Sequence, residues 1–316
     1  MAFSQGSRTR LSFIPEVTFG TTPAGNFTEL PFSTHSLNLT KERVTGNDIQ
    51  SDRMPRVDRH GNRNASGDIV VDLRNGNYDS LLESLMFNAW DATPAAAPDQ
   101  LKVGTTLKSL SIEDYLSDVD QARLFSGMIV SQASFSMQPN QMVTSTFSLM
   151  GKDMAISATE KTVDSAVINQ PFDAYSGDFR IGNFDGALSA LTAVTSIEFT
   201  INNNLNPTFV IGEATTPQME FGRCEVEGTI TAYVEDATLI NRFLNETESA
   251  FDVSINDPSG SNEYKFFFPK VKINSADTPV ENPQSRLVTM SFVALYDDAA
   301  TGEDSNLVIY RPDSNA

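Results

Sequence analysis

The sequence predicts a mainly β protein built from two tandem β-sandwich or half-barrel domains, each flanked by one α-helix. Segments of alternating apolar and polar residues run through the whole chain, which is typical of half-buried strands. The same order of segments occurs twice, which indicates a duplicated unit. The 316 residues are enough for two domains that each bury their own core. We therefore expect one domain at 1–158 and a second at 159–316.

The repeat rests on strand-like stretches that match in pattern and in order. The aligned segments are Ser36–Thr40 with Ser196–Thr200, Ser66–Leu73 with Glu227–Val234, Phe125–Gln132 with Phe267–Asn274, and Phe147 with Phe292. The second copy is shorter between its helix and the next strand, and the missing residues correspond to the Ala- and Pro-rich stretch near 92–100. The alternative is chance similarity, because alternating strands share patterns of low information.

Each half contains one short amphipathic helix after its second matched strand. The apolar stripes are Tyr78, Leu81, Leu82, Leu85 and Met86 in the first half, and Leu239, Ile240, Phe243 and Leu244 in the second. Their spacing of three and four residues places them on one helix face, which we expect to cover the sheet.

Alternation divides the strands into an apolar and a polar face. The expected core residues include Ile69, Val71, Ala133, Phe135, Phe147, Leu149, Ile197, Phe199 and Ile201. The opposite face carries Asp68, Asp72, Gln132, Ser134, Thr144, Glu198 and Thr231, all polar or acidic. Lys270 and Lys272, on either side of Val271, are exceptions. Taken alone, such a face indicates an ordinary solvated surface.

Composition excludes several classes of function. The 22 Lys and Arg against 41 Asp and Glu give a net charge of −19, which argues against tight binding of nucleic acid. The one cysteine, Cys224, allows no disulfide within the chain and fits assembly in a reducing cytosol. No apolar run approaches the roughly 20 residues of a membrane span.

The sequence offers little for catalysis or cofactor binding. Its two histidines, His35 and His60, lie in loop-like sequence, and no nucleophile elbow, zinc motif or phosphate loop occurs. Asp114, Asp118 and Asp120 lack the glycine and terminal glutamate of a calcium loop, so a solvated acidic turn is the expected structure. We expect no catalytic residues, no metal and no cofactor.

One cluster of charge stands out between two predicted strands. Arg43, Arg53, Arg56, Arg59 and Arg63 lie in a segment, 43–65, that is too long for a hairpin turn. Their guanidinium groups would suit an arm that docks on an acidic neighbour, although a solvated loop with weak ion pairs is the alternative.

The corresponding stretch of the second half, 202–224, is apolar instead. Its apolar residues are Phe209, Val210, Ile211, Met219 and Phe221, and their number indicates contact rather than exposure to solvent.

The first ninety residues resemble the double-domain tail tube proteins of long-tailed bacteriophages. The resemblance rests on Pro15–Pro23, Asp52-Arg53, Gly67-Asp68-Ile69, Gly76–Glu83 and Trp90. It is good over about 10–90, weaker to 150, and depends on the internal repeat beyond. It implies a tail-tube fold, a virion tail protein assembled in the host bacterial cytoplasm, and rings stacked into a hollow tube.

The resemblance also implies that the segment 43–65 bridges successive rings. From the residue pattern we expect the five arginines and Phe209, Met219 and Phe221 to be contacts between rings, and the polar sheet face to line the bore. A duplicated chain would form a trimer of pseudo-sixfold symmetry that conducts viral DNA without binding it specifically. The expected partners are further copies, the tape-measure protein, the tail terminator and distal tail proteins.

Alternatives remain open at this stage. A hexamer whose second domains decorate the outside would also form a tube. A minor tail, baseplate or carbohydrate-binding adhesin would share the β-sandwich, but it would favour clustered exposed aromatics, and the chain has one Trp and 7 Tyr. A β-rich hydrolase is disfavoured by the absence of catalytic motifs.

Overall fold

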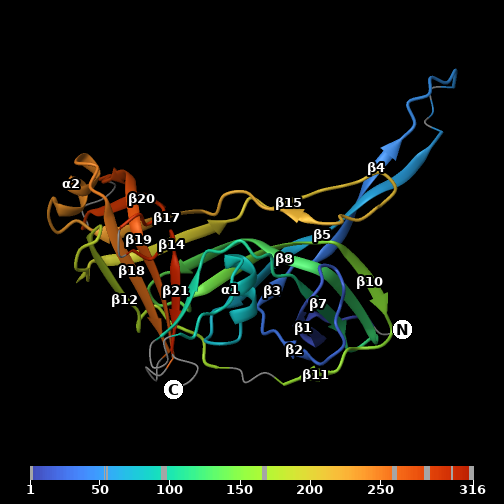
Figure 1. The fold of residues 1–316 in the computed structure, drawn as a ribbon, viewed down its shortest axis with the longest axis horizontal. Helices are drawn as coiled ribbons and strands as arrows, with labels where there is room; N and C mark the ends of the chain where they lie inside the picture. Colours follow the sequence, from blue (N-terminus) through green and yellow to red (C-terminus); the bar gives the residue numbers. More distant parts are fainter. Residues whose placement is uncertain are drawn as a thin grey trace.

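The computed structural model describes residues 3–52, 54, 56–93, 98–165, 169–257, 262–280, 285–299 and 302–312. Strands dominate these residues, and the mainly β prediction is confirmed (Figure 1). The two helices described are α1 (Asp79–Met86) and α2 (Thr238–Leu244), and a short 3₁₀ turn spans Gly6–Arg8.

The strands divide into two series along the chain. The first is β1 (Thr9–Pro15), β2 (Phe27–Glu29), β3 (Thr34–His35), β4 (Asn38–Thr45), β5 (Asp58–Asp72), β6 (Asp99–Lys102), β7 (Leu110–Leu116), β8 (Gln121–Met137), β9 (Thr144–Gly151), β10 (Asp153–Ser157) and β11 (Val163–Asp164). The second is β12 (Asp178–Asn183), β13 (Ser189–Ala190), β14 (Val194–Asn202), β15 (Asn206–Pro207), β16 (Met219–Glu220), β17 (Glu225–Tyr233), β18 (Ser249–Asn256), β19 (Glu263–Asp277), β20 (Leu287–Ala294) and β21 (Val308–Arg311).

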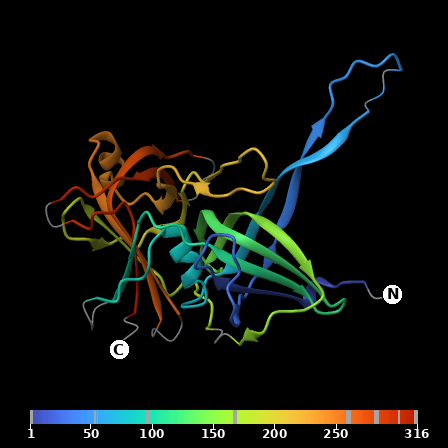
Figure 2. The same ribbon diagram turned by 45° about the vertical axis from the view of Figure 1, so that its right-hand side comes forward.

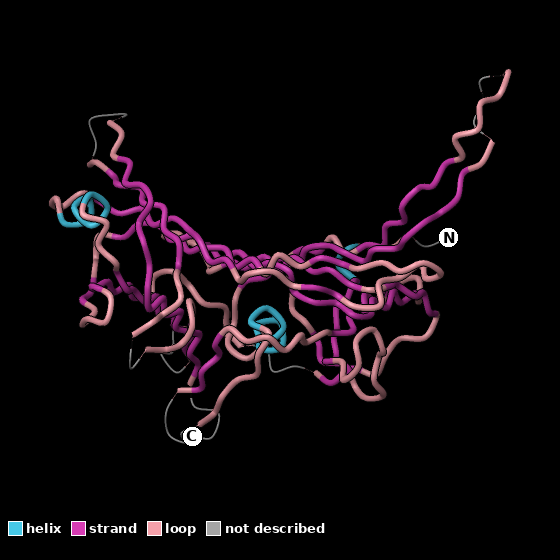
Figure 3. The backbone as a smooth tube through the Cα atoms, turned by 45° about the horizontal axis from the view of Figure 1, so that its top comes forward, coloured by secondary structure: helices cyan, strands magenta, loops and turns pink. Residues whose placement is uncertain are grey.

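Eight of these strands form one continuous antiparallel sheet, which we call the wall. Its order is β4-β5-β9-β8-β14-β17-β20-β19. The first four strands come from the first half of the chain and the last four from the second, and β8 and β14 join them edge to edge. Figure 3 shows the wall as an arc, with both helices and the remaining strands on its convex side.

A second layer of strands covers the convex side of the wall in each half. The N-terminal part of β8 leaves the wall and pairs with β7 and β10, and β7 pairs with β1. In the second half, the N-terminal part of β19 pairs with β18 and β21, and β18 pairs with β12. The pairings therefore follow the same order in both halves, with β8 and β19 as the long strands that belong to both layers.

Two glycines mark equivalent positions in the wall. A Cβ on Gly67 would lie 2.6 Å from the Cα of Leu37, and one on Gly228 would lie 2.8 Å from the Cα of Phe199. Neither position has room for a side chain, because the backbone of the neighbouring segment lies against it. Leu37 and Phe199 are thus equivalent residues of the two halves.

The pairing registers correct the alignment of the repeat that the sequence suggested. Leu37 matches Phe199 rather than Ile197, and Phe292 matches Leu149 rather than Phe147, because Gly67 pairs with Leu149 as Gly228 pairs with Phe292. A shift of two residues preserves the alternation of a strand, so pattern matching cannot detect it. Pairing partners resolve it.

One hydrophobic core runs through both halves. Phe135 of β8 stacks on Phe199 of β14, with ring centroids 4.9 Å apart, and Phe266 of β19 lies 5.0 Å from Phe135. These aromatic rings are all buried. The join between the two four-stranded sheets is therefore part of the core and not a loose contact between separate bodies.

The helices cover the wall to different degrees. In α1 the stripe is fully buried, as the spacing predicted. In α2 only Leu239 is buried, Ile240 and Phe243 are half-buried, and Leu244 is 66% exposed. The expectation that Leu244 faces the core is therefore wrong, because α2 ends at this residue and the side chain lies largely in solvent.

Candidate assembly surfaces

The polar side of the wall gathers every residue that the sequence placed on the non-core faces. Residues that pair directly with one another form a row across seven strands. The row consists of Asp72, Thr144, Ser136, Glu198, Thr229, Ser291 and Ser275. Ser134 and Thr231 lie in the rows on either side of this one, and Asp68 and Gln132 lie in the second row, where both pair with Ser148. Directly paired residues, and residues two apart on one strand, point to the same side of a sheet, so all seven candidate residues share one face. The buried core residues point to the other side, and Figure 3 shows that the helices lie on the convex side of the wall, so the polar face is the concave one.

Charge on this concave face is sparse and mostly negative. Glu198 accepts hydrogen bonds from the side chains of Ser136 and Gln138, at 3.3 and 2.8 Å. Lys272 forms an ion pair with Glu246 at 2.8 Å, and hydrogen bonding to this lysine lowers the pKa of Glu246. Lys270 pairs with Asp298 at 2.7 Å. The two lysines are thus paired with acidic neighbours and add little net positive charge.

The segment 43–65 is a projecting hairpin rather than a long loop. β4 continues through Arg43–Thr45 and β5 begins at Asp58, so only 46–57 remain as a connection. The ribbon views show this hairpin extending far beyond the body of the protein (Figure 2). We call residues 41–64 the arm.

The arginines of the arm differ in how they are held. Arg43 pairs with Asp58 at 2.8 Å across the hairpin, Arg56 pairs with Asp52, and Arg63 pairs with Asp153 at 3.2 Å at the base of the arm. Arg59 is exposed and has no ion pair among the described residues. Arg53 lies outside the described residues.

Apolar side chains also lie exposed on the arm. Ile49 is 99% exposed and Met54 is 64% exposed, and Val44 and Val57 are exposed as well. The arm therefore presents four apolar side chains among its charges, a combination typical of a surface that binds another protein.

The second-half counterpart of the arm folds back onto the chain. We call residues 203–224 the second hairpin, which contains β15 and β16. Its tip reaches the base of the arm, where the backbone N–H of Arg63 donates a hydrogen bond to the carbonyl of Ala214 at 2.7 Å (Figures 1 and 2). Met219 is buried against Phe87 and Ile129, and the ring of Phe221 lies 5.2 Å from that of Phe87. Met219 and Phe221 thus pack within the chain, while Phe209 stays 36% exposed.

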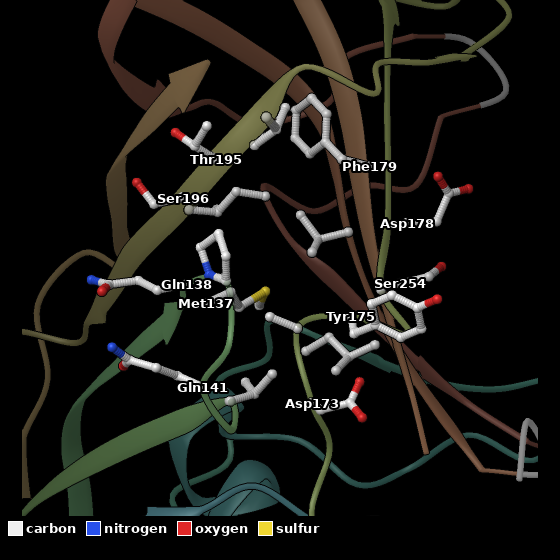
Figure 4. Close-up of a pocket in the computed structure, with 18 of the residues that line it drawn as sticks. Met137, Gln138, Gln141, Asp173, Tyr175, Asp178, Phe179, Thr195, Ser196 and Ser254 are labelled. Carbon is white, nitrogen blue, oxygen red and sulfur yellow. The ribbon is translucent and has the colours of Figure 1, made fainter. Parts of the chain in front are cut away.

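A groove of about 710 Å³ opens where β8 ends and β14 begins. Met137, Phe179 and Ile197 contribute to its apolar lining, and Figure 4 shows Gln138 and Gln141 on one side with Asp173 and Asp178 on the other. Tyr175 at its rim is 95% exposed.

The groove and the arm lie at opposite ends of the strands. On β9 the Thr144 end is next to the groove, whereas the Gly151 end pairs with Ala65 at the base of the arm. Any head-to-tail stacking of this molecule along its strands therefore brings an arm toward a groove.

The family model for the phage tail tube protein matches residues 6–300 of the chain. The chain belongs to the phage tail tube protein family. It is therefore a structural protein of the bacteriophage tail, and membership implies self-assembly into a tube. Among curated proteins, none matches the sequence. In the part of the chain that the structure describes, no helix has both the length and the apolar character needed to cross a membrane.

The motif that carried the resemblance to tail tube proteins has a clear structural basis. Glu16 accepts hydrogen bonds from the backbone N–H groups of Gly20 and Gly127 and from the hydroxyls of Ser109 and Ser111, at 2.6 to 2.8 Å. One carboxylate thus fixes the turn after β1 to the strands of the second layer.

The three acidic residues Asp114, Asp118 and Asp120 form hydrogen bonds with other protein groups. Asp114 is buried and accepts a hydrogen bond of 2.8 Å from Nε of Arg123, with Nε2 of His35 at 3.8 Å. Asp118 accepts from the backbone of Gln5, and Asp120 from Tyr115. No group of three potential ligands suited to a metal occurs among the described residues.

Proposed function

We propose that three copies of this tail tube protein share their walls in a closed ring, and that rings stack into a hollow tube that conducts viral DNA. The single observation that carries the proposal is the pairing of β8 with β14, which already joins two four-stranded sheets into one curved wall within the chain. Both ends of this wall are strand edges that further copies can extend.

We propose two tandem domains, 1–158 and 159–316, as the repeating units of the ring. The shared order of strand pairings in the two halves supports this division. The connection after residue 158 still touches the first half through β11, which pairs with β2, and the strands of the second half begin with β12. Two equivalent units per chain give three chains a pseudo-sixfold symmetry.

The size of such a ring suits a DNA duplex. Three walls of eight strands give about 24 strands, which at about 4.8 Å spacing and a tilt near 40° close into a circle about 48 Å across. Side chains of about 5 Å on each side leave a bore of about 38 Å, wider than a duplex of about 20 Å. A hexamer with its second domains outside is disfavoured, because the second-half strands lie in the same wall as the first.

The concave face would line the bore. Its hydroxyl, amide and carboxylate groups offer the phosphate backbone few favourable contacts, and its lysines are paired with acids. DNA would then pass without being held. The role is passive conduction, and we propose no catalytic step and no cofactor.

We propose that the arm docks in the groove of a copy in the next ring. The arm offers exposed Ile49 and Met54 together with Arg59, and the groove offers an apolar lining bordered by Asp173 and Asp178. Apolar burial would supply affinity, and opposite charge would fix which rim faces which. Tape-measure, terminator and distal tail proteins would meet the free rims of the tube, in a tail assembled in the host bacterial cytoplasm.

Native mass spectrometry of freshly formed rings tests the ring proposal. Three chains of 34.5 kDa give about 104 kDa, the mass we expect for a single ring. A ring of twice that mass would replace the trimer by a hexamer, and a protein that stays monomeric at every concentration would contradict ring closure. Binding of the monomer to glycans would instead favour the adhesin.

A further inference from the structure

The seam between β8 and β14 is a completed edge contact whose register is known. Ile201 lies opposite Ala133 on the core face, and Thr200 opposite Ser134 and Asn202 opposite Gln132 on the concave face. Ile201 and Ala133 are fully buried. The seam therefore shows how the last wall strand of one unit accepts the first wall strand of the next.

The two outermost strands of the wall are equivalent to the two strands of the seam. β4 pairs with β5 as β14 pairs with β17, and β19 pairs with β20 as β8 pairs with β9. Leu39 pairs with Ala65 as Ile201 pairs with Val226, so Leu39 occupies the place of Ile201.

The other end of the wall is matched in the same way. Ala276 pairs with Met290 as Ala133 pairs with Phe147, so Ala276 occupies the place of Ala133. Both long strands carry an irregularity at the same point, between Val130 and Gln132 in β8 and between Ile273 and Ser275 in β19. The two edges thus match the two sides of the seam residue by residue.

We propose that β19 of one copy pairs antiparallel with β4 of the next copy in the seam's register, with Leu39 opposite Ala276. Asn38 then lies opposite Asp277, and Thr40 opposite Ser275. This inference rests on the proposed ring and specifies how its copies join.

The side chains at the two edges fit this register. Leu39 and Ala276 are apolar like the pair that they replicate, and both are only partly buried against the core of their own chain. Pairing would complete their burial, as it does for Ile201 and Ala133 at the seam. Thr40 and Ser275 would continue the polar surface of the concave face.

The backbone at the free edge is also prepared for a partner. The N–H of Leu39 is bonded at 2.9 Å by the side chain of the preceding Asn38, a local substitute for a strand partner. In the seam, the backbone N–H of Asn203 donates to the carbonyl of Ser131, so Ile201 and Ala133, two residues away on their strands, form a hydrogen-bonded pair. Leu39 and Ala276 would form the same kind of pair. Thr40 and Ser275 would then form a non-hydrogen-bonded pair, whose side chains approach most closely.

The register fixes the slant of the strands around the bore. The row that begins at Asp72 of β5 reaches Ser275 of β19, crosses to Thr40 of the next copy and arrives at Asn64 of its β5. The row therefore reaches β5 of the next copy eight residues before the position at which it began, after crossing eight strands. A barrel whose shear equals its strand number has a tilt of about 36°. This value agrees with the tilt assumed for the ring.

Disulfide trapping in assembled rings tests the register. The variant pairs Thr40→Cys with Ser275→Cys, because the Cβ atoms of directly opposed residues are close enough for a disulfide. Cys224 is replaced by Ser in every variant, although burial already raises the pKa of its thiol to about 11 and limits its reactivity. Mild oxidation and a non-reducing gel reveal the linked species.

We expect most of the protein to become covalent trimer. Each single-cysteine variant should give no linked chains. The matched control, Thr40→Cys with Asp277→Cys, moves one partner by two residues on the same face and should link poorly. Stronger linking of this control in intact rings would overturn the register while leaving the ring itself in place. Absence of rings, seen by electron microscopy of the unmodified protein, would overturn both proposals.

Discussion

The arm and the second hairpin occupy the same place in the two halves but make opposite contacts. Both connect the first two wall strands of their half. The arm carries arginines and extends into solvent, whereas the second hairpin carries Met219 and Phe221 and packs on Phe87 of the first half. The same connection between two strands can therefore project from the chain or pack on it, and the two connections differ in their side chains.

The largest effect is expected from reversing charge on the arm. Arg56→Asp with Arg59→Asp should abolish stacking of rings while leaving the subunit folded, because both side chains are solvent-exposed. Electron microscopy would show separate rings in place of tubes. Unchanged tube formation would remove the arm from the inter-ring contact.

A compensating variant sharpens this experiment. Asp173→Arg with Asp178→Arg alone should also weaken stacking, and combining the four substitutions should restore tubes in part by exchanging the two charges. If the combined variant stacks no better than either parent, the groove is not where the arm docks.

The next effect concerns charge on the concave face. Asp68→Lys with Asp72→Lys would place cations where phosphates pass, so DNA ejection should slow and infectivity should fall. The readout is the rate of ejection from virions that carry the variant tube. Normal infectivity with correctly assembled tails would indicate that these residues do not meet DNA.

A methionine pair compares the two hairpins directly. Met219→Ala should lower the free energy of unfolding by about 2–4 kcal/mol, because it empties a buried site beside Phe87 and Ile129. Met54→Ala, at an exposed site on the arm, should leave stability unchanged and weaken stacking only. Chemical denaturation of both variants measures the difference, and equal stability of the two would mean that the second hairpin is not anchored.

The smallest effect is expected for the ion pair within the arm. Arg43→Gln removes the partner of Asp58, and both side chains are more than half exposed. Such pairs contribute about 0–1 kcal/mol. Thermal unfolding should therefore change little, and a large loss would show that the pair holds the hairpin in shape.

Much of the wall was predictable from sequence, because alternation assigns each residue to a face regardless of small register errors. Asp68, Gln132 and Glu198 lie on one face for this reason. Lys270 and Lys272 depart from the polar and acidic pattern in the sequence, and in the structure each forms an ion pair with an acidic residue.

Other features could not be predicted because they depend on contacts between distant residues. Nothing near Met219 in the sequence indicates that Phe87 and Ile129 receive it. The arm has no alternation of apolar residues, so its hairpin strands were assigned to a loop. The seam of β8 with β14 leaves no local signal, since either strand alone is an ordinary amphipathic strand.

Cryo-electron microscopy of the assembled tube at side-chain resolution tests the central claim most directly. The account predicts three chains per ring and an inner barrel to which each chain contributes the eight strands of its wall. Both halves of each chain then face the bore. An inner wall made from first-half strands alone, or six chains around each ring, would contradict it.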